Sequence, residues 1–434
     1  MKISNYTKLI KLETRYFIYN SISNFLCEID NNLFLILNAK LETKGKINYD
    51  EIDDAETWKL LISRKILTEN EKDDLLKITS SFEMMRRASQ SMNLTIAPTM
   101  DCNFSCHYCF ETKKKGAMDS KIVENIINYV NNMNQIKEVF VTWFGGEPLL
   151  HPEIINQISV GIANSDKYKY SAQIITNGYY LTINNLKMLL KNKVKHVQIS
   201  LDGIFDEHNK TRFSMNDSDS FSKIIRNIDL FHTSDFEMSL ALRINLDSNN
   251  LHTYENIHNY FTDKYIKDKR ISFAPAFIQD TTKKNNKTTI NDFEEKLHFW
   301  KNISKFNSTK DYFFYPNNKI NECAVRNYNS WVIDSEGLVY KCWEIIGNKD
   351  YAVGVIGEKG ININNDNLLR RYLFGANHLE SEKCRACFSL PICNGGCPHK
   401  RIENEFNGKN FNMCMYQENN LDKILIERIK RTFS

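Results

Sequence analysis

Short apolar runs alternate with amphipathic stretches through the middle of the chain. The amphipathic stretches have helical spacing, as in 119–130, where Ile122, Ile126 and Ile127 share one face. Six of the apolar runs have the length and side chains of strands, at 94–98, 138–144, 173–177, 197–202, 240–245 and 270–277. This alternation predicts a parallel α/β sheet, curved or barrel-like, whose reactive groups gather where the strands end.

The two ends of the chain follow other patterns. The N-terminal part has two strand-like runs around a turn at 21–24, followed by helical stretches near 33–37 and 58–66. This predicts a hairpin with two or three short helices. Beyond about residue 310 the periodicity fades, and seven of the eleven cysteines follow. We expect this last segment to be organised around metal rather than around a large apolar core.

Length, charge and cysteine usage narrow the classes of function. A chain of 434 residues predicts two or three domains. The net charge is only +4 and charges of both signs are interspersed, so nucleic acid is not an expected partner. The chain does not start like a signal peptide, and no run approaches the ~20 apolar residues of a membrane span. We therefore expect a cytoplasmic protein without a membrane partner, in which metal ligation explains clustered cysteines better than disulfides do.

The first cysteine group follows the first predicted strand. Cys102, Cys106 and Cys109 have CxxxCxxC spacing. Three thiolates on a short loop can hold three irons of a [4Fe–4S] cube and leave the fourth iron open to a ligand. A zinc site is the alternative, but it requires a fourth Cys or His, and His107 lies at the wrong position within the loop.

Two polar motifs follow other predicted strands, and another polar residue, Arg243, lies on the fifth strand. In "WFGGEP" (143–148) the glycines let the backbone approach a ligand, and Glu147 can accept from a cation. "SLDG" (200–203) offers a hydroxyl and a carboxylate that suit a ribose, and Arg243 can hold a carboxylate. Together these motifs indicate a pocket for an amino acid joined to a nucleoside.

The cysteine loop, Tyr108, the GGEP stretch and the alternating strands resemble the radical S-adenosylmethionine (SAM) enzymes. The resemblance implies that the three cysteines hold the cluster and that the open iron binds SAM, which is cleaved to a 5′-deoxyadenosyl radical with an electron from a donor such as flavodoxin or ferredoxin. The implied SAM contacts are Tyr108 near the adenine, Gly145, Gly146 and Glu147 at the methionine amino group, Ser200 at the ribose and Arg243 at the carboxylate.

The later cysteines resemble the SPASM extension of radical SAM enzymes, over about 310–420. That resemblance implies two auxiliary [4Fe–4S] clusters, an outer one on Cys384, Cys387, Cys393 and Cys414 and an inner one on Cys323, Cys342 and Cys397. Some relatives have one more cysteine shortly before the position of Cys323, whereas 305–322 contains none. One inner iron is then open or has a ligand other than cysteine. Cys27 remains, and its alternation with neighbouring apolar residues predicts a half-buried strand position.

The resemblance implies three domains and an α/β fold. Residues 1–90 would form a winged-helix-like domain that recognises a leader peptide, 91–308 a partial (β/α)6 TIM-like barrel, and 309–434 the SPASM domain with a C-terminal helix. A hairpin with helices offers an exposed strand edge, which suits capture of an extended peptide, and a packing domain is the alternative role.

The SPASM resemblance implies a peptide or protein substrate. Sulfatase maturases typically have Asp after the cysteine equivalent to Cys342, where this chain has Trp343 followed by Glu344, a candidate base. We therefore favour a maturase of ribosomally made precursor peptides that installs a thioether or another side-chain cross-link. A formylglycine-forming sulfatase maturase is the alternative, followed by a peptide epimerase and by a non-catalytic iron–sulfur or zinc module.

Overall fold

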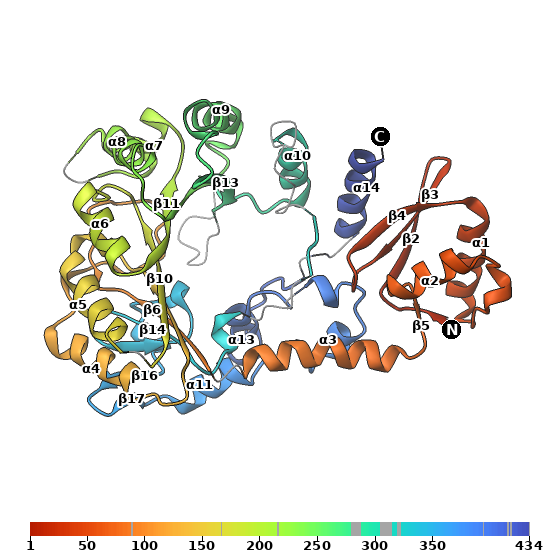
Figure 1. The fold of residues 1–434 in the computed structure, drawn as a ribbon, viewed down its shortest axis with the longest axis horizontal. Helices are drawn as coiled ribbons and strands as arrows, with labels where there is room; N and C mark the ends of the chain where they lie inside the picture. Colours follow the sequence, from red (N-terminus) through yellow and green to blue (C-terminus); the bar gives the residue numbers. More distant parts are fainter. Residues whose placement is uncertain are drawn as a thin grey trace. The chain divides into compact units, whose positions relative to one another are not determined.

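The computed structural model describes residues 1–87, 90–165, 167–214, 217–278, 288–303, 315–318, 323–393, 395–414, 416 and 419–433 (Figure 1). Its internal contacts divide the chain into two compact units. The first unit comprises Met1–Arg87, Asn307–Asn327 and Arg371–Ser434, and the second comprises Ala88–Phe306 and Tyr328–Arg370. Within the described ranges, no helix is both long and apolar enough to cross a membrane.

The second unit is built on a ten-stranded sheet with the order β13-β12-β11-β10-β9-β6-β14-β15-β16-β17. The six predicted strands are all present and pair in parallel with their sequence neighbours. They are β6 (Ser91–Ile96), β9 (Glu138–Trp143), β10 (Lys169–Thr176), β11 (Val194–Leu201), β12 (Ser239–Leu246) and β13 (Ile271–Phe277). The prediction of a parallel α/β sheet is confirmed.

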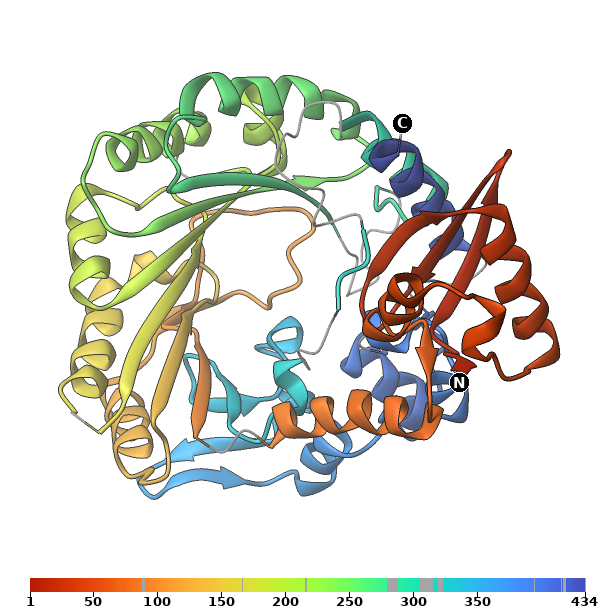
Figure 2. The same ribbon diagram turned by 45° about the vertical axis from the view of Figure 1, so that its right-hand side comes forward.

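Helices cover the outer side of this curved sheet, as Figure 2 shows. In α4 the side chain of Asp119 caps the N-terminus by accepting from the Ile122 amide, and Val123, Ile126 and Val130 are buried. The predicted helix at 119–130 is thus confirmed, with its buried face centred on Ile126. The α-helices that follow the parallel strands along the chain, up to residue 303, are α4 (Ser120–Asn131), α5 (Pro152–Ala163), α6 (Ile183–Lys191), α7 (Phe205–Thr211), α8 (Ser220–His232), α9 (Tyr254–Tyr265) and α10 (Phe293–Ile303).

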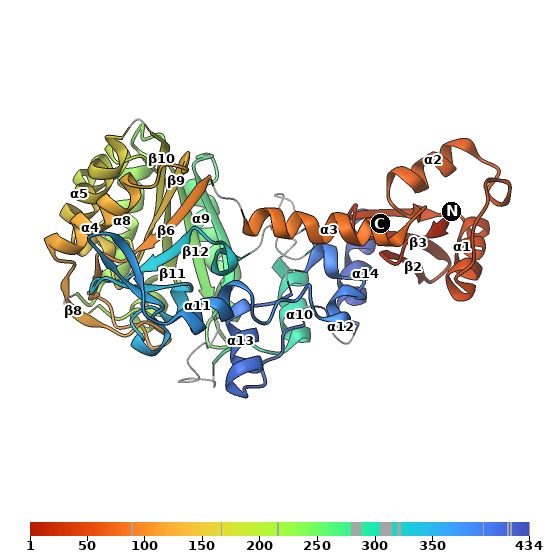
Figure 3. The ribbon, with the colours of Figure 1, turned by 90° about the horizontal axis from the view of Figure 1, so that it is seen from below.

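Four short strands from the C-terminal part extend the sheet. The strand β14 (Ser330–Ile333) pairs in parallel with β6, so two distant segments lie side by side in Figure 3. Antiparallel strands β15 (Leu338–Tyr340), β16 (Gly354–Gly357) and β17 (Gly360–Ile363) follow. Buried side chains such as Val332, Ile333, Val339 and Ile356 attach these strands to the core of the second unit, a contribution that the sequence pattern did not predict. Strands of three or four residues are too short to give a readable periodicity.

The first unit contains a three-stranded antiparallel sheet of β2 (Thr7–Leu12), β3 (Arg15–Asn20) and β4 (Phe25–Ile29). The strands β3 and β4 are the predicted hairpin, and β2 was not predicted. Helices α1 (Asn31–Thr43) and α2 (Ala55–Ser63) pack on one face and confirm the two helical stretches. Cys27 is half-buried against this apolar cluster, as predicted.

The other face of the small sheet is covered by the C-terminal helix α14 (Asn420–Thr432). Phe17 and Tyr19 of β3 pack with Leu425 and Ile429 of that helix. The remaining helices and the short strand pairs complete the two units: α3 (Glu71–Arg86), α11 (Asp366–Leu373), α12 (Glu382–Arg385), α13 (Pro398–Asn407), β1 (Lys2–Ile3) with β5 (Leu67–Thr68), and β7 (Thr99–Met100) with β8 (Lys114–Ala117). The two ends of the chain therefore share one hydrophobic core.

Candidate active site

The CxxxCxxC loop borders a cavity of about 470 Å³ at the carboxyl ends of the parallel strands. Cys102, Cys106 and Cys109 all line it, as predicted from their position after the first strand. The loop is fixed to the segment after α7, because the Ser105 amide donates to the Phe213 carbonyl at 2.7 Å. The three thiols are thus presented to one enclosed space by an anchored loop.

Burial raises the pKa of each of these thiols. The pKa of Cys102 rises to about 12 and that of Cys109 to about 11, and in both cases a neighbouring glutamate adds to the effect of burial. The pKa of Cys106 is also raised by burial, against the opposing positive charge of Arg212. Without metal the thiols stay protonated at neutral pH, so metal binding must displace their protons.

The zinc alternative requires a fourth ligand beside the cysteines. His107 does not line the cavity, and its Nε2 lies 3.8 Å from Asp247 Oδ2 in a separate polar pocket. Among the described residues, no three or more His, Cys, Asp or Glu side chains converge as a single metal ion requires. The donor set of three partly buried cysteines fits a [4Fe–4S] cube with one iron left open.

The two glycines of "WFGGEP" line the cavity but are required chiefly by the packing of the chain. A Cβ atom on Gly146 would lie 2.1 Å from the Asp101 carbonyl oxygen, and one on Gly145 would lie 2.5 Å from the Thr99 oxygen. Gly145 also has a φ of +109°, which favours glycine. The glycines therefore let the strand β9 loop press against the backbone that leads into the cysteine loop.

Glu147 is fully buried beside the cavity and does not line it. Its carboxylate accepts from the Leu149 amide at 3.0 Å, the Thr176 hydroxyl at 2.7 Å and the Asn177 amide at 2.7 Å. Burial raises its pKa despite these hydrogen bonds. Because a carboxylate has about four acceptor sites, one remains for a further donor.

Ser200 and Arg243 face the same cavity from adjacent strands. They are register partners in the parallel pair β11 and β12, and both line the space. Arg243 Nε donates to Asn245 Oδ1 at 3.1 Å, and burial lowers the pKa of the guanidinium. The strand pairing thus brings together a hydroxyl and a guanidinium that lie 43 residues apart in the sequence.

A buried polar cluster behind the cysteine loop was not predicted as a unit. The Tyr108 hydroxyl donates to Asp202 Oδ1 at 2.7 Å and accepts from Arg212 Nη1 at 2.7 Å. Asn245 Nδ2 donates to the Tyr108 hydroxyl oxygen and to Asp202 Oδ1, at 3.1 Å in each case. The expectation that the "SLDG" carboxylate serves a ribose is not met in this arrangement, because Asp202 is fully buried and faces Tyr108. Nothing in the local sequence around Arg212 signals this contact across 104 positions.

Glu111 was also missed, although it follows the cysteine loop directly. It lines the cavity, and its Oε2 is buried without a hydrogen-bond partner among the described residues. Burial, helped by the negative charge of Glu147, raises its pKa to about 8. A carboxyl group in this state is a neutral acid near pH 7 in the metal-free protein.

An aromatic stack forms one side of the cavity. Phe110 and Phe144 have ring centroids 6.4 Å apart, Phe144 and Trp343 have centroids 5.7 Å apart, and both pairs are stacked. Trp343, at one end of the stack, is 42% exposed, and its neighbour Glu344 lines the same cavity. The structure therefore brings the predicted base candidate to the cavity that contains the cysteines.

The later cysteines form no disulfide with one another in the described part of the chain, and they occur in both units. Cys342 is buried after β15 in the second unit. The other six lie in the first unit: Cys323, Cys384, Cys387, Cys393, Cys397 and Cys414. There the Cys387 amide donates to the Cys384 carbonyl at 3.1 Å in a tight turn. Most of the segment 305–322, in which some relatives have a further cysteine and this chain has none, lies outside the described residues.

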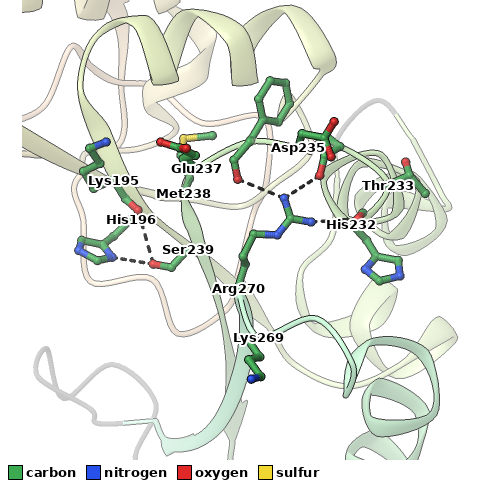
Figure 4. Close-up of a pocket in the computed structure, with 12 residues that line it drawn as sticks. Lys195, His196, His232, Thr233, Asp235, Glu237, Met238, Ser239, Lys269 and Arg270 are labelled. Atoms are coloured by element: carbon green, nitrogen blue, oxygen red, sulfur yellow. Dashed lines mark hydrogen bonds between the residues drawn. The ribbon is translucent and has the colours of Figure 1, made fainter.

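A second, larger hollow of about 850 Å³ lies at the amino ends of β11, β12 and β13 (Figure 4). Its central guanidinium, that of Arg270, donates to the carbonyls of Ser234, Phe236 and His232 at 2.6–3.1 Å, and to both oxygens of Asp268. These bonds close the C-terminal end of α8. These hydrogen bonds hold α8 and the segment after it in place, so Arg270 has a structural role rather than a catalytic one.

Known proteins share both the sequence pattern and the fold. Residues 96–260 match the radical SAM superfamily. A cysteine-type anaerobic sulfatase-maturating enzyme of Clostridium novyi is 28% identical over 357 residues, which span 75% of this chain and 92% of that enzyme. The structure of anSMEcpe with bound AdoMet and Cp18Cys peptide covers 79% of this chain and 96% of that one, with 21% identity and a TM-score of 0.57. The structure of Streptococcus suis SuiB bound to S-adenosylmethionine covers 92% of this chain and 95% of SuiB, with 16% identity and a TM-score of 0.50.

These likenesses agree with the cavity and its donors. The radical SAM superfamily implies SAM and a [4Fe–4S] cluster. The three cysteines that would hold the cluster lie within the matched residues and open on one cavity with Ser200 and Arg243. The chain therefore contains a radical SAM domain at residues 96–260, and its likeness to sulfatase-maturating enzymes indicates an enzyme that acts on a peptide or protein.

Proposed function

We propose that the protein is a maturase that modifies a ribosomally made precursor peptide by radical SAM chemistry. The observation that carries this proposal is the convergence of the Cys102, Cys106 and Cys109 thiols with Ser200 and Arg243 on one cavity of about 470 Å³. That volume lies within the range of sites that enclose a small molecule. The cavity opens at the carboxyl ends of parallel strands, where such folds carry out chemistry.

Three side chains that line the cavity, and Glu147 beside it, have a role toward SAM in this proposal. The Arg243 guanidinium would hold the methionine carboxylate through paired N–H donors, and Ser200 would bind the ribose. The methionine ammonium group would lie at Gly145 and Gly146, which line the cavity, next to the buried Glu147 carboxylate with its one remaining acceptor site. Tyr108, whose hydroxyl is held by Arg212 and Asp202, would present its ring edge near the adenine.

When bound, the cluster and SAM supply a 5′-deoxyadenosyl radical that removes a hydrogen atom from the substrate. The chain itself must position that substrate and exclude water. The stacked rings of Phe110, Phe144 and Trp343 form an apolar wall next to the cysteines. An apolar wall limits the contact of a reactive intermediate with water and so reduces side reactions.

The N-terminal sheet is the proposed site for the leader of the precursor peptide. In the described part of the chain, β2 and β4 each pair only with β3, so each leaves one edge without a strand. An extended peptide can add to such an edge through main-chain hydrogen bonds. Both faces of the sheet are covered, by α1 with α2 and by α14, so the edges are the available backbone surface. A domain of residues 1–90 that recognises a leader remains part of the proposal.

The bond formed is proposed to be a thioether or another side-chain cross-link. Two auxiliary [4Fe–4S] clusters on the later cysteines would accept the electron left after coupling, and an open iron on the inner one could bind a substrate thiolate. Trp343 supports cross-linking over formylglycine formation, because it fills the position where sulfatase maturases have Asp. An electron donor such as flavodoxin or ferredoxin would start each turnover.

A sulfatase maturase that oxidises Cys or Ser to formylglycine is the second candidate. The likeness to the Clostridium novyi enzyme and to anSMEcpe with its bound peptide favours it. Glu344 lines the cavity one residue after Trp343 and could replace the missing aspartate as a base. This candidate needs no leader-binding domain.

The two candidates differ in the mass of their products. The reconstituted protein would be incubated anaerobically with SAM and dithionite, either with a short peptide encoded next to its gene or with a synthetic sulfatase peptide containing Cys. Loss of two hydrogens without an aldehyde on the first peptide supports the cross-link. An aldehyde on the sulfatase peptide alone supports the second candidate, and 5′-deoxyadenosine formation without any peptide product rejects both assignments of substrate.

A further inference from the structure

Arg212 is a buried cation in the reaction cavity. It is the C-cap residue of α7, where its amide donates to the His208 carbonyl at 2.8 Å. Only 8% of the residue is exposed, and it lines the same space as Cys106. A buried guanidinium is costly unless its charge meets a partner, so its surroundings indicate what it serves.

The guanidinium is directed at the residue between two cysteines of the loop. Its Nη1 donates to the Tyr108 hydroxyl at 2.7 Å and lies 3.7 Å from Asp202 Oδ1. The charge also lies over the Phe104 ring, with 5.8 Å to the centroid. Its Nε is buried without a hydrogen-bond partner among the described residues. The Nε–H group therefore remains available to an acceptor in the cavity.

Two backbone links hold the cysteine loop to the residues that follow Arg212. The Ser105 amide donates to the Phe213 carbonyl, and Phe104 forms an isolated antiparallel bridge with Ser214. These links do not involve the Arg212 side chain. They fix the position of the cysteine loop relative to the backbone of Arg212. We expect both links to persist when the Arg212 side chain is replaced.

The other cations that line the cavity contact different groups, a backbone carbonyl of the cysteine loop and an asparagine of β12. Lys113 donates to the Phe104 carbonyl, and Arg243 Nε donates to Asn245. The acidic groups that line the cavity are Glu111 and Glu344. Arg212 is therefore the cation that donates to a side chain of the cysteine loop, that of Tyr108. In this buried environment a fixed charge acts more strongly than it does in water.

We propose that Arg212 is a positioning residue for the radical SAM cluster, which fixes the cysteine loop through Tyr108 and places a permanent positive charge that makes the cluster easier to reduce. The proposal rests on the proposed function, because it requires a [4Fe–4S] cluster on Cys102, Cys106 and Cys109. Reduction adds one electron, and a nearby cation favours the more negative state. Net charge and hydrogen bonds around the sulfurs are established determinants of cluster potential.

The test compares Arg212→Gln, which removes the charge, with Arg212→Lys, which keeps it. Reconstituted proteins would be titrated with dithionite, and the midpoint potential read from the EPR signal that SAM perturbs. We expect a more negative midpoint and about tenfold slower 5′-deoxyadenosine formation in Arg212→Gln, with both restored toward wild type in Arg212→Lys. Arg86→Gln is the matched control, since Arg86 is also buried and paired with a carboxylate, Glu83, but lies in α3.

The outcomes separate this inference from the proposed function. An unchanged midpoint in Arg212→Gln at normal iron content overturns the role of Arg212. If Arg212→Gln does not retain iron, Arg212→Lys decides: iron and midpoint kept support the role of the charge, and iron lost there too overturns it. A wild-type protein that takes up no SAM-responsive cluster contradicts the proposed function instead, before any variant is compared.

Discussion

Two hollows lie at opposite ends of the same parallel strands, and they differ in how their polar groups are satisfied. The hollow at the amino ends holds about 850 Å³, and Arg270 there meets carbonyl and carboxylate oxygens with all its nitrogens. The cavity at the carboxyl ends holds only about 470 Å³, yet Glu111 and Arg212 keep buried atoms without partners among the described residues. Of these two hollows, the smaller one is thus the one lined by buried polar atoms without partners in the described part of the chain.

The largest expected effect is at the cysteine loop. Cys102→Ala should reduce 5′-deoxyadenosine formation to the level without enzyme, because the open-iron cluster loses one of its three ligands. Chromatography of the anaerobic reaction measures this. Cys27→Ala is the matched control: Cys27 packs against an apolar cluster of the first unit, so we expect about 1 kcal/mol of lost stability and unchanged cleavage. Equal loss of SAM cleavage in both variants would contradict the assignment of Cys102 to the cluster and of Cys27 to packing alone.

Gly146→Ala should produce the next largest effect at the same end. Its new Cβ would lie 2.1 Å from the Asp101 carbonyl oxygen, so the β9 loop or the cysteine loop must move. A displacement of about 1 Å can reduce the rate by about 10²-fold. Gly45→Ala is the control, since its closest contact is a side-chain oxygen of Thr43 at 3.1 Å. Normal SAM cleavage by Gly146→Ala would show that the cavity tolerates this shift.

Arg270→Met tests the amino end, where we expect stability to change and chemistry to persist. The variant loses charged hydrogen bonds to Asp268 and to the carbonyls that end α8, a loss of about 2–3 kcal/mol. The melting temperature should fall by roughly 5–10 °C, while SAM cleavage per folded molecule stays constant. A selective loss of cleavage at full stability would make the hollow a second functional site.

The smallest effect concerns pH. Hydrogen bonds from Arg270, and then from His232, hold the pKa of Asp268 well below its usual value near 3.8. A carboxyl group with a lowered pKa stabilises the fold above the unfolded value and loses that contribution as the pH falls through the folded value. The melting temperatures of wild type and Asp268→Asn should differ by a constant amount above about pH 5 and converge below about pH 4. A gap that widens on acidification would contradict this sign.

The sequence predicted the parts of the fold that repeat. Six apolar runs gave the six parallel strands, and the residues after them reached the cavity because parallel strands end on one edge. The strands β14 to β17 were missed because runs as short as "LVY" do not distinguish a strand from a loop. The packing of α14 on β3 was missed because it joins residues about 400 positions apart, and no local pattern encodes such a contact.

The candidate site divides in the same way. Cys102, Ser200 and Arg243 were found because each follows or belongs to a predicted strand. Arg212 was not found, because it reaches Tyr108 only through the turn after α7. Asp202 was assigned to a ligand, although burial and the Tyr108 hydroxyl commit it to the protein interior. Residue types indicate which chemistry is possible, and tertiary contacts decide which groups are left free to perform it.

The most direct test is a crystal structure of the anaerobically reconstituted protein with SAM. We predict a [4Fe–4S] cube on Cys102, Cys106 and Cys109, with SAM in the adjoining cavity, its carboxylate on Arg243 and its ribose near Ser200. The hollow around Arg270 should contain only solvent. SAM bound outside the cavity, or a mononuclear metal on the three cysteines, would contradict the assignment of the reactive end.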